Sequence, residues 1–226
     1  MNKIYELLIE SGMWKSVLSG LLVTLKISAL SVLFGTILGA GICRLRMSRF
    51  RVLSRAAGFY IAVLRGMPVL MLLMMMYYVV FARSDMEADI IAVITFSLNS
   101  SAYFAELMRS ALLASDKGQA EAARTLGFSR IQAFFLVTLP QAVDIARPVY
   151  ESAVVNLIQW TSVVGYVTIT DLTRVINTAS SRTMQPVIMI CLGMLLYLGI
   201  AYLVKAIFCF TGRKKTNRLK GAKNEE

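Results

Sequence analysis

Apolar residues form five long runs along the chain, and the shorter stretches between these runs hold most of the charged residues. A helix needs roughly 20 predominantly apolar residues to cross a bilayer core of about 30 Å. Helices suit lipid because each satisfies its backbone hydrogen bonds internally. The pattern therefore predicts five transmembrane helices, at residues 21–43, 59–81, 90–113, 148–167 and 186–210.

The composition agrees with this pattern, since 57% of the 226 residues are hydrophobic and only 16% are charged. Soluble globular domains contain about 25% charged residues. No hydrophilic block is long enough to fold as a separate soluble unit, so we expect an all-α integral membrane protein with a single transmembrane domain over residues 1–226. Residues 2–18 are either an amphipathic helix or a frayed terminus, and they lack the pattern of a cleaved signal peptide.

Charged residues predict the topology. Basic residues follow the first, third and last apolar runs, whereas acidic residues outnumber basic ones between the second and third runs. The positive-inside rule therefore places the N-terminus outside and the C-terminus in the cytoplasm. The same rule accounts for the net charge of +11, so we expect no nucleic-acid partner.

Several kinds of chemistry are disfavoured. The three cysteines lie in or beside apolar runs, which argues against a disulfide framework. The chain has no histidine and no G-x-x-x-x-G-K-[ST] sequence, which removes His-based triads, H-E-x-x-H sites and the usual phosphate-binding loop. We expect no catalytic residue, metal ion or cofactor on this chain. A membrane enzyme would have only Glu106 and Glu151 as intramembrane acids.

Residues 118–142 are a polar, amphipathic insertion between two of the apolar runs. Residues 119–126 are good helix formers. Gly127 can take a left-handed conformation at the end of that helix, and Ser129 can begin a second helix. Pro140 then marks a kink or a new helix start. The stretch is predicted to be a helix, a turn and a second helix on the cytoplasmic surface.

The insertion also carries a spaced motif. Glu121-Ala122-Ala123 is followed after three residues by Gly127, after nine more by Val137, and then by Leu139-Pro140. This spacing resembles the EAA loop of the membrane subunits of ATP-binding-cassette (ABC) importers. From about residue 20 to 210, the chain resembles permease subunits of polar-amino-acid ABC importers, the group of histidine, glutamine, arginine and cystine systems. Further matching pieces are T-L-x-x-S at 24–28, R-G-x-P-V-L at 65–70, A-Y-x-A-E-x-x-R at 102–109 and T-S-V at 161–163.

The resemblance implies a type I ABC importer permease fold, with five transmembrane helices and a cytoplasmic coupling-helix (EAA) loop, in the bacterial inner membrane. It implies an ATPase subunit dimer that binds the ATP, a second permease chain (the same or a paralogue), an extracytoplasmic solute-binding protein and a polar amino-acid substrate. The implied ATPase-coupling residues are Gly118, Glu121, Ala122, Ala123 and Gly127, held in place by Leu139 and Pro140.

Polar residues within the third and fourth predicted helices should face a partner helix or a wet pathway, because they are costly in hydrocarbon. Glu106 and Arg109 lie three residues apart and form either a structural ion pair or part of a gate. The second predicted helix is broken at residues 65–68, where freed carbonyls need partners. The candidate translocation-pathway residues are Asn99, Tyr103, Glu106, Glu151, Asn156, Gln159, Thr161 and Ser162.

One departure from the family pattern concerns the substrate. Many members have Lys-Asp before the Thr-Ser pair and another acid seven residues before that Asp, and these acids are thought to hold the substrate. Here the positions read Gln159-Trp160 and Ala153. Glu151 lies on a different helical face and is no substitute. This chain either lacks an intramembrane substrate site or is the less substrate-involved half of a heterodimer.

The alternative function is a channel or a secondary transporter, and either of these would move its substrate without ATP.

Overall fold

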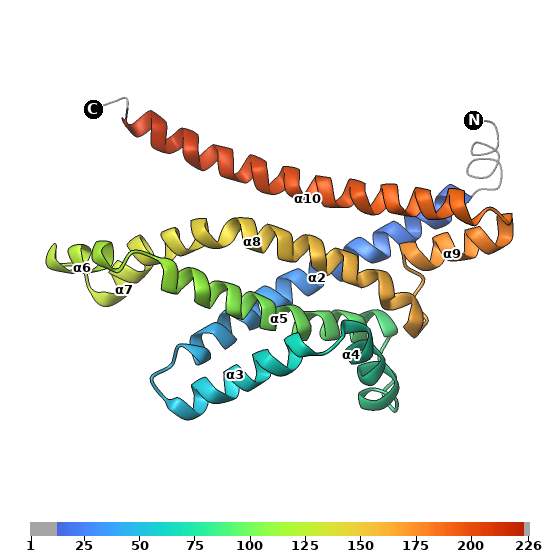
Figure 1. The fold of residues 1–226 in the computed structure, drawn as a ribbon, viewed down its shortest axis with the longest axis horizontal. Coiled ribbons are helices and arrows are strands. Elements are labelled where there is room, and N and C mark those ends of the chain that lie inside the picture. The colour runs from blue at the N-terminus through green and yellow to red at the C-terminus, as the bar shows by residue number, and fades with distance from the viewer. Residues whose placement is uncertain (1–12, 224–226) are drawn as a thin grey trace. The chain divides into compact units, whose positions relative to one another are not determined.

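The computed structural model describes residues 13–223, and that part of the chain is built from helices joined by short turns (Figure 1). The prediction of an all-α protein is confirmed. Most of the predicted helix 2–18 lies outside the described residues. The helices are α2 (Met13–Arg46), α3 (Arg51–Gly66), α4 (Val69–Met75), π-helix η2 (Met76–Val80), α5 (Ala88–Ala114), α6 (Lys117–Thr125), α7 (Arg130–Ala133), π-helix η3 (Phe134–Thr138), α8 (Leu139–Trp160), 3₁₀-helix η4 (Thr161–Val167), α9 (Leu172–Thr183) and α10 (Pro186–Lys223).

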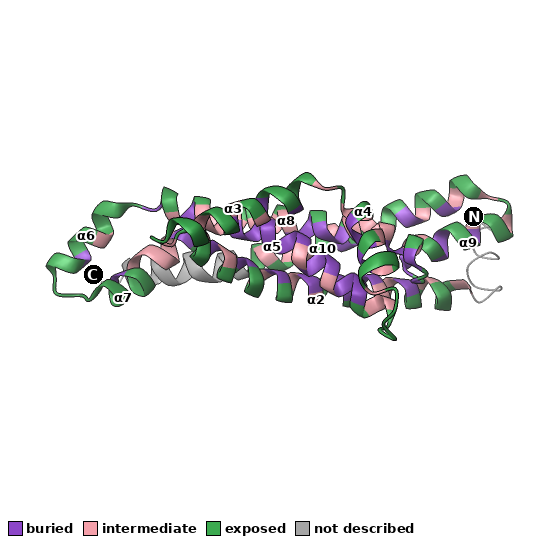
Figure 2. Cartoon of the chain, turned by 90° about the horizontal axis from the view of Figure 1, so that it is seen from below, coloured by how far each residue is buried: buried purple, intermediate pink, exposed green. Residues whose placement is uncertain are grey.

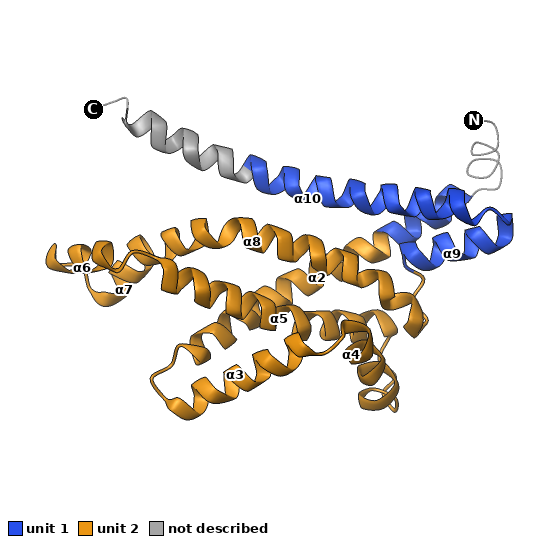
Figure 3. Cartoon of the chain, in the orientation of Figure 1, with its two compact units in different colours: residues 1–21, 171–226 blue, residues 22–170 orange. Residues whose placement is uncertain are grey.

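The chain divides into two compact units (Figure 3). The larger unit is residues 22–170, and the smaller one combines residues 1–21 with residues 171–226. Helix α2 continues from the smaller unit into the larger one. A single domain over residues 1–226 stays a prediction.

Helix α5 is the centre of the larger unit and packs against α3, α4 and α8. Its middle turns are almost completely buried, with Phe96 and Phe104 each 1% exposed. Helix α2 also approaches α5 closely, because Gly39 faces it without a side chain. A Cβ atom on Gly39 would lie 2.9 Å from the Cβ atom of Phe104 and 3.0 Å from the carbonyl oxygen of Ser101. Small residues at such crossings let membrane helices pack tightly.

The second predicted helix is broken at the expected place. Helix α3 ends at Gly66, Met67 and Pro68 are extended, and α4 with η2 leaves at an angle of 103° to α3. The amide of Asn99 donates to the Leu64 carbonyl oxygen at 2.9 Å, and the Tyr103 hydroxyl donates to the Arg65 carbonyl oxygen at 3.5 Å. Neighbouring side chains therefore satisfy the freed carbonyls, as lipid requires.

The number of membrane spans depends on how broken helices are counted. Three helices of the described chain are long and apolar enough by themselves, namely α2, α5 and α10 as far as Phe210. Two pairs of consecutive broken helices also qualify, so the count rises to at most five when each pair is one span. The predicted span 59–81 corresponds to the first pair, which is broken at Met67 and Pro68. The predicted span 148–167 lies inside the first member of the second pair, Arg130–Val167, where η4 continues α8 in 3₁₀ form, and the break of that pair falls between Val167 and Leu172.

The smaller unit is held together by α9 and α10. Asp171 begins α9, and its carboxylate accepts hydrogen bonds from the backbone N–H groups of Thr173 and Arg174 at 3.1 and 3.0 Å. The hydroxyl groups of Thr173 and Tyr197 are 2.8 Å apart and join α9 to α10. This unit therefore contains a helix pair in which α9 is capped by Asp171 and joined to α10 by a side-chain hydrogen bond.

Candidate functional site

The polar insertion forms a helical hairpin whose first helix is α6. The Asp116 carboxylate accepts from the Gly118 backbone N–H at 2.8 Å, so the helix begins two residues earlier than predicted. At its end, Gly127 has a φ of 93°, and the turn is closed by hydrogen bonds from Gly127 N–H to the Arg124 carbonyl and from Phe128 N–H to the Ala123 carbonyl. This pair of bonds defines a Schellman motif with glycine at its left-handed position. The predicted role of Gly127 in the turn is confirmed.

The second half of the hairpin begins with a capping box. The Ser129 hydroxyl accepts from the Gln132 N–H at 3.3 Å, and the Gln132 side chain accepts from the Ser129 N–H at 2.9 Å. Helix α7 is followed by the π-helical turn η3 and then by α8, with Pro140 in the first turn of α8. Proline has no N–H and clashes with the carbonyl four residues back, which explains the wider turn just before it.

The hairpin presents both charge and apolar surface to solvent (Figure 2). Glu121 and Ala122 are exposed, whereas Ala123 is 7% exposed and packs inward. Leu126 and Ile131 are 80% and 72% exposed. Phe128 between them is 42% exposed, and such a group of exposed apolar side chains on one turn is typical of a contact surface. Leu126 was not among the predicted site residues, although an apolar residue beside the glycine of a polar loop was the signal.

A glutamine ties this hairpin to the bundle. The Gln141 side chain accepts from the Asp116 N–H at 3.1 Å and donates to the Gln119 side chain at 2.6 Å. Gln141 follows Leu139 and Pro140 in the first turn of α8, so the start of α6 is bonded directly to the start of α8. The resemblance implied a supporting role for Leu139 and Pro140, which stays a prediction, and the two observed hydrogen bonds come from the next residue, Gln141.

Several candidate pathway residues have structural partners instead of open surroundings. Asn99 is buried and bound to Leu64, and the buried Thr161 hydroxyl donates to the Ile158 carbonyl at 2.6 Å. Glu106 and Arg109 form the predicted ion pair, with Arg109 Nε 2.9 Å from Glu106 Oε2. These groups have satisfied polar atoms, which fits a role in packing the bundle.

An aromatic and cationic stack lies between α5 and the end of α8. The Tyr103 and Trp160 rings have centroids 5.2 Å apart, and the Arg65 guanidinium lies 5.1 Å from the centroid of Tyr103. Trp160 therefore places a ring at the position where the family pattern described above implied an acid. Arg65 belongs to this cluster, although its sequence context indicated only a helix break.

The remaining candidates lie on α8 and η4. Asn156 and Gln159 are exposed, while Glu151 and Ser162 are half-buried. In the described part of the chain, no hydrogen bond joins these four side chains to Tyr103 or Trp160. Their place in a translocation pathway stays a prediction.

The described chain therefore combines long apolar helices, typical of an integral membrane protein, with a capped polar hairpin that Gln141 joins to α8. Residues 31–211 match the family described as binding-protein-dependent transport system inner membrane component, and the chain belongs to this family. It is a multi-pass transporter permease and not in itself an enzyme. The family implies a binding protein and an ATPase as partners.

Relatives of known type are similar over most of the chain. The probable amino-acid ABC transporter permease protein YckA of Bacillus subtilis is 35% identical over 204 residues, which cover 90% of this chain and 89% of that protein. The arginine transport system permease protein ArtQ of the same organism is 32% identical, over 90% of this chain and 92% of its own length.

Solved structures agree with the fold. A chain from the crystal structure of an amino acid ABC transporter with histidines has a TM-score of 0.81 and 28% identity, and the match covers 91% of this chain and 96% of that one. A chain of the MetNI methionine ABC transporter in an inward-facing conformation has a TM-score of 0.75 at 19% identity, which supports the fold alone. The type I ABC importer permease fold is confirmed.

Proposed function

We propose that this chain forms half of the translocation pathway of an ATP-driven importer for a polar amino acid. An extracytoplasmic binding protein delivers the substrate, a second permease chain completes the pathway, and an ATPase dimer binds and hydrolyses the ATP. The observation that carries the proposal is the hairpin, because its exposed Glu121 and Leu126 lie in α6 and directly after it, and Gln141 of α8 is hydrogen-bonded to the start of α6.

The hairpin supports a simple coupling mechanism. When the ATPase subunits close around ATP, they displace the exposed surface of α6 and the α6–α7 turn. The Gln141 hydrogen bonds transmit this displacement to the first turn of α8. Helix α8 packs along α5 and carries Trp160 at its far end, so its movement changes the contact with Tyr103. Coupling between distant sites requires an element with two discrete arrangements, and this proposal assigns that role to the hairpin with α8.

The names of the relatives support the substrate class. They include permeases for cystine, arginine and octopine transport. Each of these solutes carries charged groups at both ends of a small molecule. In this chain, Arg65 and the rings of Tyr103 and Trp160 offer a guanidinium and aromatic faces, while Ala153 and Trp160 offer no carboxylate. This supports a substrate whose cationic group is held by the second permease chain.

Reconstitution tests the proposal. The chain is purified with its second permease chain and ATPase and placed in liposomes with binding protein and radiolabelled amino acids. We expect uptake that requires ATP and binding protein. The Glu121→Lys variant should insert normally and lose uptake, whereas Arg182→Gln, an exposed change outside the hairpin, should not.

Two results would contradict the proposal. Substrate flux through the chain alone, without ATP, would indicate a passive transporter. Normal uptake by the Glu121→Lys complex would remove the hairpin from the coupling mechanism.

A further inference from the structure

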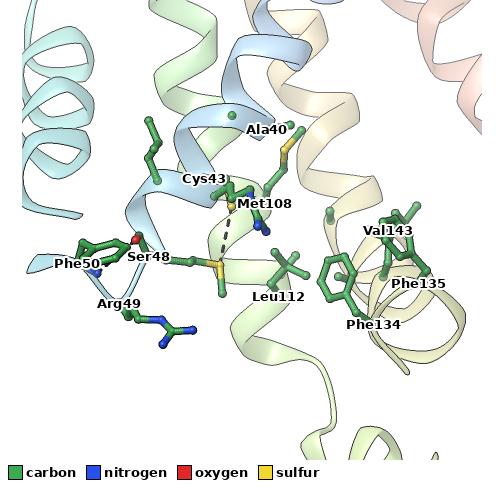
Figure 4. Close-up of a pocket in the computed structure, with 18 residues that line it drawn as sticks. Ala40, Cys43, Ser48, Arg49, Phe50, Met108, Leu112, Phe134, Phe135 and Val143 are labelled. Atoms are coloured by element: carbon green, nitrogen blue, oxygen red, sulfur yellow. Dashed lines mark hydrogen bonds between the residues drawn. The ribbon is translucent and has the colours of Figure 1, made fainter. Parts of the chain in front are cut away.

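A cavity of about 770 Å³ lies within the larger unit, between the end of α2, the end of α5, and the junction of η3 with α8 (Figure 4). Most of its wall is apolar. Figure 4 shows Ser48, Arg49 and Phe50 on one side of the cavity, Phe134, Phe135 and Val143 on the other, and Met108 and Leu112 between them. The coupling mechanism proposed above does not use this cavity.

The polar part of the wall is cationic. Arg44 and Arg49 line the cavity, and neither guanidinium has an ion pair or a hydrogen bond in the described part of the chain. Arg46, which lies between them in sequence, is already occupied, because its guanidinium donates to the carbonyl and hydroxyl oxygens of Ser54 at 3.2 and 2.9 Å. The cavity therefore combines two free guanidinium groups with a long apolar surface.

The position of these arginines matches the surface of a bilayer. Helix α2 has 34 residues and is about 51 Å long, which exceeds the bilayer core of about 30 Å. The predicted span ends at residue 43, so Arg44 is the first charged residue after the hydrocarbon. Under the proposed topology, this end faces the cytoplasm, where anionic headgroups attract clustered arginines.

We propose that this cavity binds one anionic phospholipid from the inner leaflet. Its phosphate is held by Arg44 and Arg49, since a guanidinium pairs with phosphate through parallel N–H bonds. One acyl chain lies along Met108, Leu112 and Phe134. A free phosphate would leave the apolar wall uncovered, and an apolar helix would leave both guanidinium groups unpaired.

The site connects the lipid to coupling. Phe134 and Phe135 belong to η3, which follows the capping box of the hairpin, whereas Arg49 lies on the opposite wall (Figure 4). A lipid held between the two walls contacts α2 on one side and, on the other, η3 and the start of α8, which follow the hairpin. Transport driven by ATP should therefore depend on the anionic lipid fraction, a consequence that rests on the proposed function.

The experiment compares matched arginine pairs. The purified importer complex is placed in nanodiscs of phosphatidylcholine with or without phosphatidylglycerol, and bound phosphatidylglycerol is measured by native mass spectrometry. We expect Arg44→Gln with Arg49→Gln to lower specific binding about tenfold or more. Arg51→Gln with Arg55→Gln removes the same charge from the same basic stretch but not from the cavity, and should leave binding unchanged.

A steric variant tests the apolar wall independently. Gly41 lines the cavity, and a Cβ atom there would meet nothing within 4 Å, so Gly41→Leu adds bulk without a backbone clash. We expect this variant to lose the bound lipid while it keeps both arginines. Equal losses in the two arginine pairs, or full lipid retention by Gly41→Leu, would overturn the proposal. Failure of the wild-type complex to transport would contradict the proposed function and leave the lipid result intact.

Discussion

Gly127 illustrates how one residue shapes the contact surface of the hairpin. Its φ of 93° lies in the region that glycine adopts freely and other residues avoid. A Cβ atom at Gly127 would meet nothing within 4 Å, so any penalty of substitution comes from the backbone and not from crowding. Because Leu126 and Phe128 flank it, a change in this turn redirects the apolar side chains that we propose contact the ATPase.

Two substitutions of Gly127 should separate the effect of backbone strain from the effect of adding a side chain. A left-handed conformation costs an ordinary residue roughly 1–2 kcal/mol, which corresponds to about a 5- to 30-fold loss of the native turn. Gly127→Val should therefore reduce ATP-driven uptake by about that factor. Gly127→Asn should retain most uptake, since asparagine tolerates positive φ. The measurement is uptake in proteoliposomes normalised to assembled complex, and equal activity of both variants would contradict this explanation.

At the scale of elements, the break between α3 and α4 depends on side chains from α5. Asn99 is 2% exposed and supplies the amide that binds the Leu64 carbonyl. Tyr60 adds a second link, because its hydroxyl lies 2.8 Å from that of Ser101 and 3.2 Å from the Leu98 carbonyl. The bend in the second helix is therefore held by polar contacts with its neighbour and not by proline alone.

Removal of the Asn99 amide should weaken this element. Asn99→Leu leaves the Leu64 carbonyl without its partner, and an unsatisfied buried polar group costs about 1–3 kcal/mol. We expect a lower melting temperature of the purified complex. Gln159→Leu is the control, because Gln159 is exposed and its loss strands no buried group. An equal shift in both variants would indicate a general effect of removing an amide.

At the scale of the whole molecule, the distribution of charged residues between the helices predicts how the chain is oriented in the membrane. The acidic turn near Asp85 and the basic hairpin lie at opposite ends of α5, which is 27 residues long and about 40 Å from end to end. This length is enough to cross the bilayer core. The two loops are therefore expected on opposite sides of the membrane.

Cysteine labelling tests this orientation. With Cys43, Cys191 and Cys209 replaced by serine, a single cysteine is placed at Asp85 or at Arg124. We expect a membrane-impermeant maleimide to label Asp85→Cys in intact cells. Labelling of Arg124→Cys should require permeabilised cells, which also serve as the control for reactivity. The reverse pattern would invert the topology and contradict ATPase docking on the hairpin.

The sequence predicted those features that depend on local chemistry. The glycine turn, the Ser129 cap and the break at residues 65–68 each follow from the conformational preference of one or two residues, and all three are confirmed. Features that depend on packing were not predictable. Nothing local distinguishes buried Asn99 from exposed Gln159, and the stacking of Arg65 on Tyr103 requires the bend that brings them together.

The short helices of the hairpin have a practical consequence. Helix α6 has nine residues and α7 has four, whereas isolated helices shorter than about 12–15 residues are marginal in water. A synthetic copy of residues 117–133 would consequently be mostly unstructured and a weak competitor for the ATPase. A peptide inhibitor derived from this region would need an added covalent bridge to replace the stiffness that Gln141 and α8 provide in the intact subunit.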